Sequence, residues 1–296
     1  MKNAPRPRFD NSIHLPTRAW TFLGLGLQAL PEFPTKGRWE WIWFGHRDKT
    51  RVERGRLPGG AYIDCHLSDT YETWVWMRRV DTVELGVLRR LLRPGDSFID
   101  VGAHIGLWSL IAGTSVGTGG KVFSLEPNPE TYPKLLHNLN LNRNATTWVP
   151  SQIAADAQTG TVGFDPGEFS TCVAHVTTTA QNLIQVSSRT IDDVISGEPI
   201  AGMKIDVEGH EYAVIQGAGA TIDQFHPWLC VEFNNGIHQL DNLASWNVDG
   251  VLRQMGYRCW LFRDALCSQT MPPLQSTFST NDYVNLFYRW RGGEKV

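Results

Sequence analysis

The sequence predicts an α/β protein built on a Rossmann-like, doubly wound and mostly parallel β-sheet. Strand-like and helix-like segments alternate from residue 81 to the end of the chain. A glycine-containing turn, Gly102 to Gly106, directly follows the first of these strands. Two strands close the chain without a long helix between them, which predicts an antiparallel strand at one edge of the sheet.

Each element follows from a local pattern. Hydrophobic runs bounded by turn-forming residues predict strands at 97–102, 121–128, 146–156, 202–207, 227–234, 257–262 and 282–290. Apolar residues at helical spacing predict helices at 82–92, 104–115, 129–142, 190–196, 210–218 and 248–256. Residues 161–166 and the threonine-rich stretch up to Val186 predict additional β-structure.

The first 80 residues have a different texture and predict an aromatic-rich N-terminal cap. They contain six of the twelve tryptophans, and the run "RWEWIWFGH" places Trp39, Trp41 and Trp43 on one side of a strand. These indoles either fill a small core or form an aromatic wall for a flat or sugar-like substrate. Residues 56–63 predict a turn between two strands. We therefore expect a substrate-recognition region at 1–80 and a cofactor-binding domain at 81–296.

Composition restricts the class of protein and its setting. A hydrophobic content of 42% and a net charge of -3 indicate a globular chain that is not drawn to nucleic acid or to an anionic membrane. The five cysteines form no C-x-x-C pair, which predicts neither a zinc site nor a disulfide framework and favours the cytoplasm. The apolar run 19–30 is too short to span a bilayer, so we expect a helix there.

A ligand site is predicted at the carboxyl ends of the first two strands of the main domain. Asp100 and Gly102 reach this edge, and Gly106 lets the next helix begin closely. Glu126 ends the second strand, where it can accept hydrogen bonds from both hydroxyls of a ribose. Alternatively, Glu126 caps the helix that follows Pro127.

A nicotinamide cofactor and S-adenosylmethionine are the two candidate ligands for this edge. The nicotinamide fingerprint needs three glycines around a pyrophosphate. Here one glycine is missing, and the carboxylate of Asp100 precedes the turn. A cationic ligand with an amino group and a ribose fits better, which favours S-adenosylmethionine.

Polar residues also close the fourth and fifth strands of the main domain: Lys204, Asp206, Glu208 and His210, then Glu232, Asn234 and Asn235. Lys204, Asp206 and Glu208 share one face if the strand persists. So many charged groups in a strand need partners. They form either an ion-pair network around Lys204 or a reaction centre, and we predict the reaction centre.

In these residues the sequence resembles the FkbM family of S-adenosylmethionine-dependent methyltransferases. The resemblance covers residues 71–234 and rests on "PGDSFIDVGAHIGLWSL", "GKVFSLEPNPETYPKLLHNLNLN", "TIDDVI", "MKIDVEGHEYAVIQGA" and "PWLCVEFN". His104 replaces the asparagine of the family's usual D-V-G-A-N-I-G. The resemblance implies a class I methyltransferase fold. It also implies a cofactor site formed by Tyr71, Glu72, Asp100, Gly102, His104, Gly106, Glu126, Ala155 and Asp206.

The resemblance further implies methyl transfer to an oxygen atom. An alcohol is a weak nucleophile at neutral pH, so a base or a metal is required. We expect Glu208 or His210 to be the base and Asp206 to orient the cofactor or to act as a ligand. Related sugar and catechol enzymes hold Mg²⁺ at places comparable to Asp206, Glu232 and Asn234, and hard oxygen ligands suit that ion.

The sequence therefore predicts an O-methyltransferase acting on a sugar, a glycoside or another secondary metabolite. An NAD(P)-dependent oxidoreductase and a non-catalytic S-adenosylmethionine-binding protein are the alternatives. The expected partner is a small-molecule acceptor, with no nucleic acid and no membrane, since no basic stripe with interleaved aromatic residues occurs. A homo-oligomer is left open.

Overall fold

The computed structural model describes residue 43 and residues 49–167, 175–177, 183–281 and 283–292. Its centre is a seven-stranded sheet in the order β12-β13-β11-β10-β3-β4-β5. The strands are β3 (Ser97–Val101), β4 (Lys121–Leu125), β5 (Thr147–Ser151), β10 (Gly202–Ile205), β11 (Trp228–Asn234), β12 (Tyr257–Leu261) and β13 (Tyr283–Trp290). All neighbouring pairs from β11 to β5 are parallel, whereas β13 is antiparallel to both of its neighbours.

This topology confirms the predicted doubly wound sheet. The chain enters the sheet at β3, moves outward through β4 and β5, and then returns to form β10 on the other side of β3. The strand order therefore reverses between β3 and β10, where ligands bind in such sheets. The antiparallel strand is β13, which lies one position in from the edge, because β12 pairs with its outer side.

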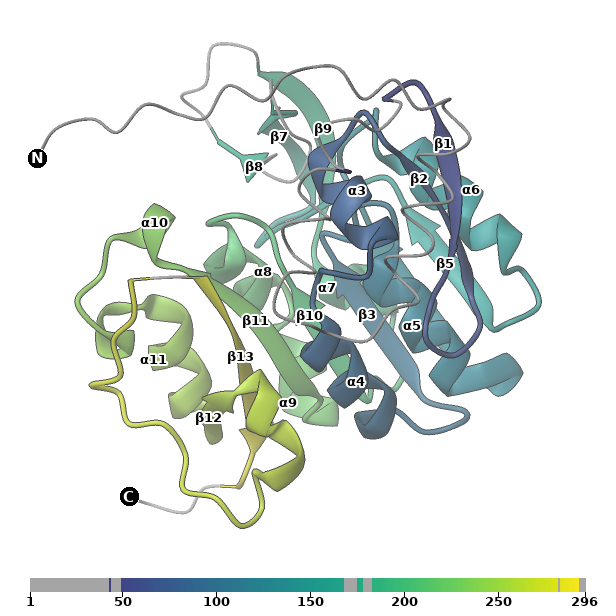
Figure 1. The fold of residues 1–296 in the computed structure, drawn as a ribbon. Coiled ribbons are helices and arrows are strands. Elements are labelled where there is room, and N and C mark those ends of the chain that lie inside the picture. The colour runs from purple at the N-terminus through teal and green to yellow at the C-terminus, as the bar shows by residue number, and fades with distance from the viewer. Residues whose placement is uncertain (1–42, 44–48, 168–174, 178–182, 282, 293–296) are drawn as a thin grey trace, which may run out of the picture.

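Helices cover both faces of the sheet (Figure 1). One face packs against α4 (Thr82–Leu91), α5 (Leu107–Val116) and α6 (Tyr132–Leu141), and the other against α7 (Ile191–Ile195), α8 (Glu211–Gly217), α9 (Gly219–Phe225) and α11 (Asn247–Gln254). Side chains alternate between the two faces along β3, so this strand contributes to the hydrophobic core on each face. Phe98 packs in the core with α4, α5 and α6, and Ile99 and Val101 pack in the core with α7, α8, α9 and α11. The short helices are α10 (Asn235–His238), η1 (Gly117–Gly119), η3 (Leu243–Ser245) and η4 (Phe262–Cys267).

Two larger differences separate the predicted elements from the observed ones. The expected strand 146–156 is divided, because β5 ends at Ser151 and β6 (Ala154–Ala155) joins a second sheet. That sheet has the order β6-β9-β7-β8, with β7 (Gly160–Asp165), β8 (His175–Val176) and β9 (Ile184–Arg189), and it confirms the predicted additional β-structure. Helix α9 follows α8 directly and was not predicted.

The N-terminal elements pack on the same core as α4 and α5. Strands β1 (Val52–Arg56) and β2 (Tyr62–His66) form a hairpin through the predicted turn, and α3 (Thr70–Trp76) follows. The indoles of Trp43 and Trp76 are buried and stacked, with their ring centroids 5.1 Å apart. Trp43 has helical backbone rather than the predicted strand, and Trp39 and Trp41 lie outside the described residues. A division of the chain at residue 80 stays a prediction.

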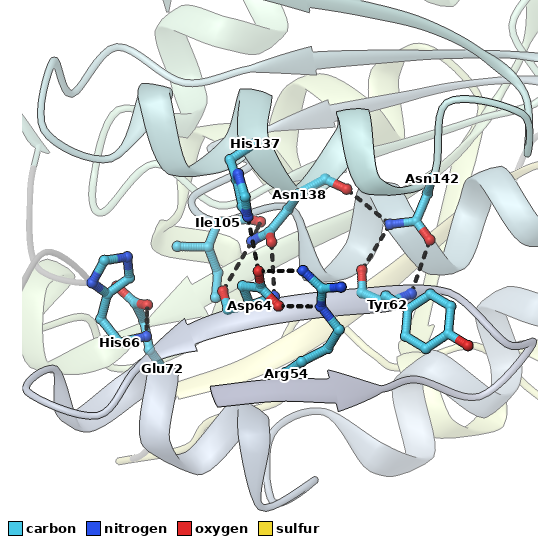
Figure 2. A network of polar contacts seen from close by, with 9 residues as sticks. All are labelled: Arg54, Tyr62, Asp64, His66, Glu72, Ile105, His137, Asn138 and Asn142. Atoms are coloured by element: carbon cyan, nitrogen blue, oxygen red, sulfur yellow. Dashed lines mark hydrogen bonds and ion pairs between the residues drawn. The ribbon is translucent and has the colours of Figure 1, made fainter. Parts of the chain in front are cut away.

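Side-chain amides of α6 and of its C-cap, Asn142, bond to the edge of β2 (Figure 2). Asn142 accepts from the backbone N–H of Tyr62 at 2.8 Å and donates to its carbonyl at 2.7 Å. One helical turn earlier, Asn138 accepts from the N–H of Asp64 at 2.8 Å and donates to the carbonyl of Ile105 at 3.0 Å. These amides satisfy backbone groups that an edge strand would otherwise expose.

Charged side chains complete this contact. Arg54 donates two hydrogen bonds to Asp64 at 2.7 and 2.8 Å, and His137 lies 2.8 Å from the same carboxylate (Figure 2). The carboxylate of Glu72 is fully buried, and it accepts from the N–H of His66 and from the ammonium of Lys134, both at 2.6 Å. Glu72 thus joins α3, β2 and α6.

In the described part of the chain, no helix has the length and apolar character needed to cross a membrane. Of the cysteines, Cys65, Cys230, Cys259 and Cys267 are free thiols. Cys172 and the apolar run 19–30 lie outside the described residues.

The ion pair between the buried Glu72 and the partly exposed Lys134 gives a stability prediction. We expect Glu72→Ala to lower the free energy of unfolding by about 3 kcal/mol, because a buried N–H and an ammonium lose their acceptor. Arg54→Ala is the control, since Arg54 is exposed and its loss should cost much less. Urea denaturation measures both changes. Equal losses for the two variants would contradict the role assigned to Glu72.

Candidate active site

A cavity of about 990 Å³ lies at the carboxyl ends of β3, β4, β10 and β11. In Figure 1, strand β11 runs toward α10 at one edge of the sheet. Helix α3 and the strands β7 and β8 lie beyond this same edge. Residues of α3 and of the α3–α4 loop line one part of the cavity, and residues of β6, β7 and β8 line another. The volume lies at the upper end of the range for small-molecule sites, roughly 300–1,000 Å³.

Gly102 forms the floor of the cavity between β3 and β10. Its φ of +79° is in the left-handed region, and a Cβ atom there would overlap the carbonyl oxygen of Asp206. The N–H groups of Gly102 and Ala103 both donate to the carbonyl of Leu125, at 3.0 and 2.9 Å. Glycine is therefore required because the three strand ends converge here.

Glu126 lines the cavity at the end of β4. One carboxylate oxygen accepts from the N–H of His104 and the other from the N–H of Asn128, both at 2.8 Å. Burial raises the pKa of Glu126 to about 7, although both hydrogen bonds act in the opposite direction. Each oxygen keeps a further lone pair for a ligand hydroxyl. Glu126 therefore does not cap α6, whose N-cap is Thr131; it fixes the turns at His104 and Asn128 and still has lone pairs for a ligand.

His104 lies in the turn after β3 with a φ of +49°. Its ring meets the ring of Tyr71 edge-on at 4.7 Å, and both side chains line the cavity. Burial lowers the pKa of His104 to about 4, so the imidazole is neutral at physiological pH. Ala155, in β6, lines the opposite part of the cavity with Ile153.

Three predicted cofactor residues lie behind the cavity wall rather than on it. Asp100 is fully buried and accepts from the hydroxyl of Ser109 in α5 at 2.6 Å, because its side chain points toward that helix. Glu72 is occupied between β2 and α6, as described above. Gly106 begins α5, and a Cβ atom there would come within 2.8 Å of Leu135. Gly106 therefore permits close packing of α5 on α6.

Three carboxylates converge at the ends of β10 and β11. Asp206, Glu208 and Glu232 each offer an oxygen within 4.8 Å of the others. Strand β10 ends at Ile205, and Glu208 has a φ of +49°, so the predicted alternation along one strand face does not hold. The side chains meet because the chain turns after β10.

Burial and mutual repulsion set the charge of this acidic group. Burial, followed by the nearby charge of Asp206, raises the pKa of Glu208 to about 7. Burial and the charges of Asp206 and Glu208 raise the pKa of Glu232 well above its ordinary value, so Glu232 holds a proton at neutral pH. Lys204 donates to Asp206 at 2.8 Å. Burial alone would lower the pKa of Lys204, but Asp206 and Asp100 hold it well above its usual range.

Asn234 and His210 flank the carboxylates. Asn234 donates to Glu208 at 3.2 Å, and its amide oxygen accepts from the N–H of Gly236 at 3.1 Å as the cap of α10. One lone pair of this amide oxygen is thus in use, and Glu208 joins Asp206 and Glu232 among the possible metal ligands. His210 lines the cavity, with Nε2 3.0 Å from a carboxylate oxygen of Asp156.

Sequence reasoning missed several residues of the cavity wall: Trp74, Arg79, Val80, Asp81, Trp108, His175 and Tyr283. Trp108 lies in the helix after the glycine turn, and Trp74 belongs to the tryptophan-rich region, from which only Trp39, Trp41 and Trp43 were considered for an aromatic wall. Tyr283 begins β13 and is paired with Asn234 in the neighbouring strand β11. Its position depends on the strand order, which no local pattern reveals.

Comparisons with known proteins place this geometry in context. The model of the methyltransferase FkbM domain matches residues 100–259, more than half of the 296 residues. The chain is 27% identical to the hexuronic acid methyltransferase AglP of Haloferax volcanii over 173 residues, which are 56% of this chain and 69% of that protein. It is 45% identical over 42 residues to the ribosomal RNA large subunit methyltransferase E of Sorangium cellulosum, covering 14% of this chain and 20% of the other.

Among solved structures, the chain is similar to methyltransferase FkbM from Methylobacillus flagellatus KT. The TM-score is 0.42 and the sequence identity is 16%. The alignment covers 74% of this chain and 55% of that chain.

The contact between Gly102 and Asp206 gives a second prediction. Gly102→Ala should lower the free energy of unfolding by about 3 kcal/mol, from backbone strain and from overlap with the carbonyl oxygen. Gly95→Ala is the matched control, because Gly95 also has a positive φ of +90° but open space around it. That variant should lose about 1 kcal/mol from strain alone. If chemical denaturation gives both variants the same loss, the close approach of the strands is not what requires glycine.

Proposed function

The chain belongs to the FkbM family of methyltransferases, and from this we propose that it transfers the methyl group of S-adenosylmethionine to a hydroxyl group of a sugar or glycoside. The proposal rests on one cavity that is lined both by Glu126, at the end of β4, and by Asp206, Glu208 and Glu232, at the ends of β10 and β11. Glu126 would bind the ribose hydroxyls, with the adenine beside Ile153 and Ala155. The sulfonium would then lie over Gly102, and its methyl group would face the acids after β10.

Methyl transfer is an in-line displacement at the methyl carbon. The bond from carbon to sulfur breaks as the bond from the acceptor oxygen to carbon forms, and S-adenosylhomocysteine leaves. The acceptor hydroxyl must lose its proton, so a base has to lie beside it. Glu208 is the base that the geometry supports best, because Asn234 orients its carboxylate next to Asp206. His210, oriented by Asp156, is the second candidate.

The proposal of a sugar acceptor rests on two observations. One is the similarity to a hexuronic acid methyltransferase, which supports a sugar of some kind. The other is the mixed lining of the cavity, with aromatic rings of Tyr71, Trp74 and Tyr283 beside hydrogen-bonding acids. Flat apolar surfaces combined with convergent polar groups suit a carbohydrate ring. An acceptor carried on a ribosomal RNA is not favoured, because that similarity covers only 42 residues.

A divalent cation is a further candidate at this place. Asp206, Glu208 and Glu232 supply the hard oxygen donors that Mg²⁺ prefers, whereas Lys204 already neutralises part of their charge. Bound there, the ion would polarise the acceptor hydroxyl and favour loss of its proton. Asp206 and Glu232 of the sequence prediction belong to this group of carboxylates, and Asn234 retains one free lone pair on its amide oxygen.

The assignment of the base predicts the effect of two substitutions. Glu208→Gln should lower kcat at least about 100-fold, because a positioned general base contributes roughly 10²- to 10⁴-fold, while the affinity for S-adenosylhomocysteine stays close to that of wild type. His210→Ala should lower kcat much less. Methyl transfer is measured by mass spectrometry with a panel of glycosides. The reverse pattern would assign the base to His210, and full activity in both variants would exclude both residues.

Metal dependence has a separate test. If the three carboxylates hold Mg²⁺ for the reaction, exhaustive EDTA treatment should abolish methyl transfer and added Mg²⁺ should restore it. Isothermal titration of Mg²⁺ into wild type and Glu232→Gln gives a second readout that does not need activity. Undiminished turnover after EDTA treatment would remove the ion from the proposal.

Titration of S-adenosylhomocysteine and of NADH into the purified protein separates the proposal from its alternatives. Binding of S-adenosylhomocysteine alone supports a methyltransferase, and binding of NADH alone would support an oxidoreductase. Binding of the adenosyl ligand without methylation of any glycoside would support a non-catalytic binding protein.

A further inference from the structure

We propose that Asp81 is the carboxylate that binds the α-ammonium group of the cofactor's methionyl part. This inference rests on the proposed function and deepens it, because neither the sequence motifs nor the family match, which begins at residue 100, includes Asp81. The sequence placed Asp100, not Asp81, among the cofactor-binding residues. The structure instead directs Asp100 toward Ser109, away from the cavity wall.

The carboxylate of Asp81 is presented to the cavity with one oxygen held in place. Oδ2 accepts a hydrogen bond from the indole Nε1 of Trp108 at 2.8 Å. Among the described residues, Oδ1 has no hydrogen-bond partner, and the half-buried side chain lines the cavity. An indole N–H can only donate, so the contact fixes the orientation of the carboxylate without neutralising its charge. Such a group is prepared to bind a cation.

The backbone of Asp81 is strained in a way that its neighbouring helix does not explain. Asp81 stands at the N-cap of α4 with a φ of +47°, in the left-handed region. An aspartate at this position usually accepts an N–H of the first helical turn, but the side chain of Asp81 makes no such bond. The residue thus gives up its ordinary capping role and points its carboxylate at the cavity. Strain of this kind is typical of functional sites.

The position of Asp81 fits the length of the cofactor. Glu126 lies at the end of β4, Gly102 at the end of β3 and Lys204 near the end of β10, so an adenosyl ligand extends across three neighbouring strands. With the ribose at Glu126, the methionyl part reaches the region of Lys204 and Trp108. The ammonium of Lys204 lies 5.2 Å from the centre of the Trp108 ring, and the same indole bonds to Asp81.

The charges in this region favour an incoming ammonium group. Asp206 already neutralises Lys204 through the 2.8 Å ion pair, so Lys204 leaves little net repulsion. Tyr71, Trp74 and Trp108 contribute aromatic walls to the same cavity, and such rings attract cations over their faces. Asp81 supplies the formal negative charge that a desolvated ammonium needs.

The test compares three ligands by isothermal titration calorimetry with the full chain: S-adenosylhomocysteine, its deaminated analogue and 5′-methylthioadenosine. The last lacks the whole amino-acid part. We expect Asp81→Asn to weaken S-adenosylhomocysteine about 10- to 100-fold, as for loss of a hydrogen bond between charged groups. The other two ligands should change less than about twofold, because neither contains the ammonium group. Asparagine keeps an acceptor for Trp108, so the turn is preserved.

Each remaining outcome overturns the inference or the function on which it rests. Equal weakening of all three ligands would make Asp81 a structural residue, and no weakening would leave the ammonium to another group. Asp100→Asn is the comparison variant: a selective loss there, with none in Asp81→Asn, would assign the task to Asp100. If wild type binds none of the three ligands, the proposed function itself fails. If Asp81→Asn does not fold, Asp81→Glu, which keeps the charge, must bind S-adenosylhomocysteine selectively over its deaminated analogue, or the inference is abandoned.

Discussion

The close approach of β3 to β10 is the constraint on which the site depends. The chain passes Asp206 so near to residue 102 that only a hydrogen atom fits between the two backbones. This contact brings the turn after β3, the acid at the end of β4 and the acids after β10 around one cavity. A parallel sheet whose strand order reverses at this point leaves a cavity beyond the strand ends. Because residue 102 is a glycine, no side chain projects from this position into the cavity or against Asp206.

Much of the fold could be predicted from the sequence because its signals are local. Alternating hydrophobic runs, the glycine turn and the closing pair of strands were sufficient for the doubly wound sheet. The place of β13, second from the edge, depends on pairing between strands far apart in the chain. The division of residues 146–156 between two sheets likewise follows from which partners Ala154 and Ala155 find, not from their own propensity.

The site was predicted less completely, and side-chain direction is the reason. Asp100 has the right position in its strand, but the alternation of strand faces turns it toward Ser109. Glu208 and Glu232 were identified as members of a reaction centre or metal site, although Glu208 reaches it through a left-handed turn rather than along a strand. Asp81 and Tyr283 come from loops and edges whose position is set only by tertiary packing. The tryptophans proved to have two roles, since Trp43 and Trp76 fill the core and Trp74 lines the cavity.

The acid-rich lining of the cavity has a consequence for turnover. Asp81, Glu126, Asp206 and Glu208 outnumber Lys204 and Arg79 on the described wall. Because Glu126 and Glu208 have pKa values of about 7, the local field favours positive charge more strongly as the pH rises above neutral. Under the proposed function, the cofactor enters as a sulfonium and departs as a neutral thioether. The electrostatic attraction that helps to hold the methyl donor is therefore weakened by the reaction itself. Departure of the spent cofactor is thereby made easier.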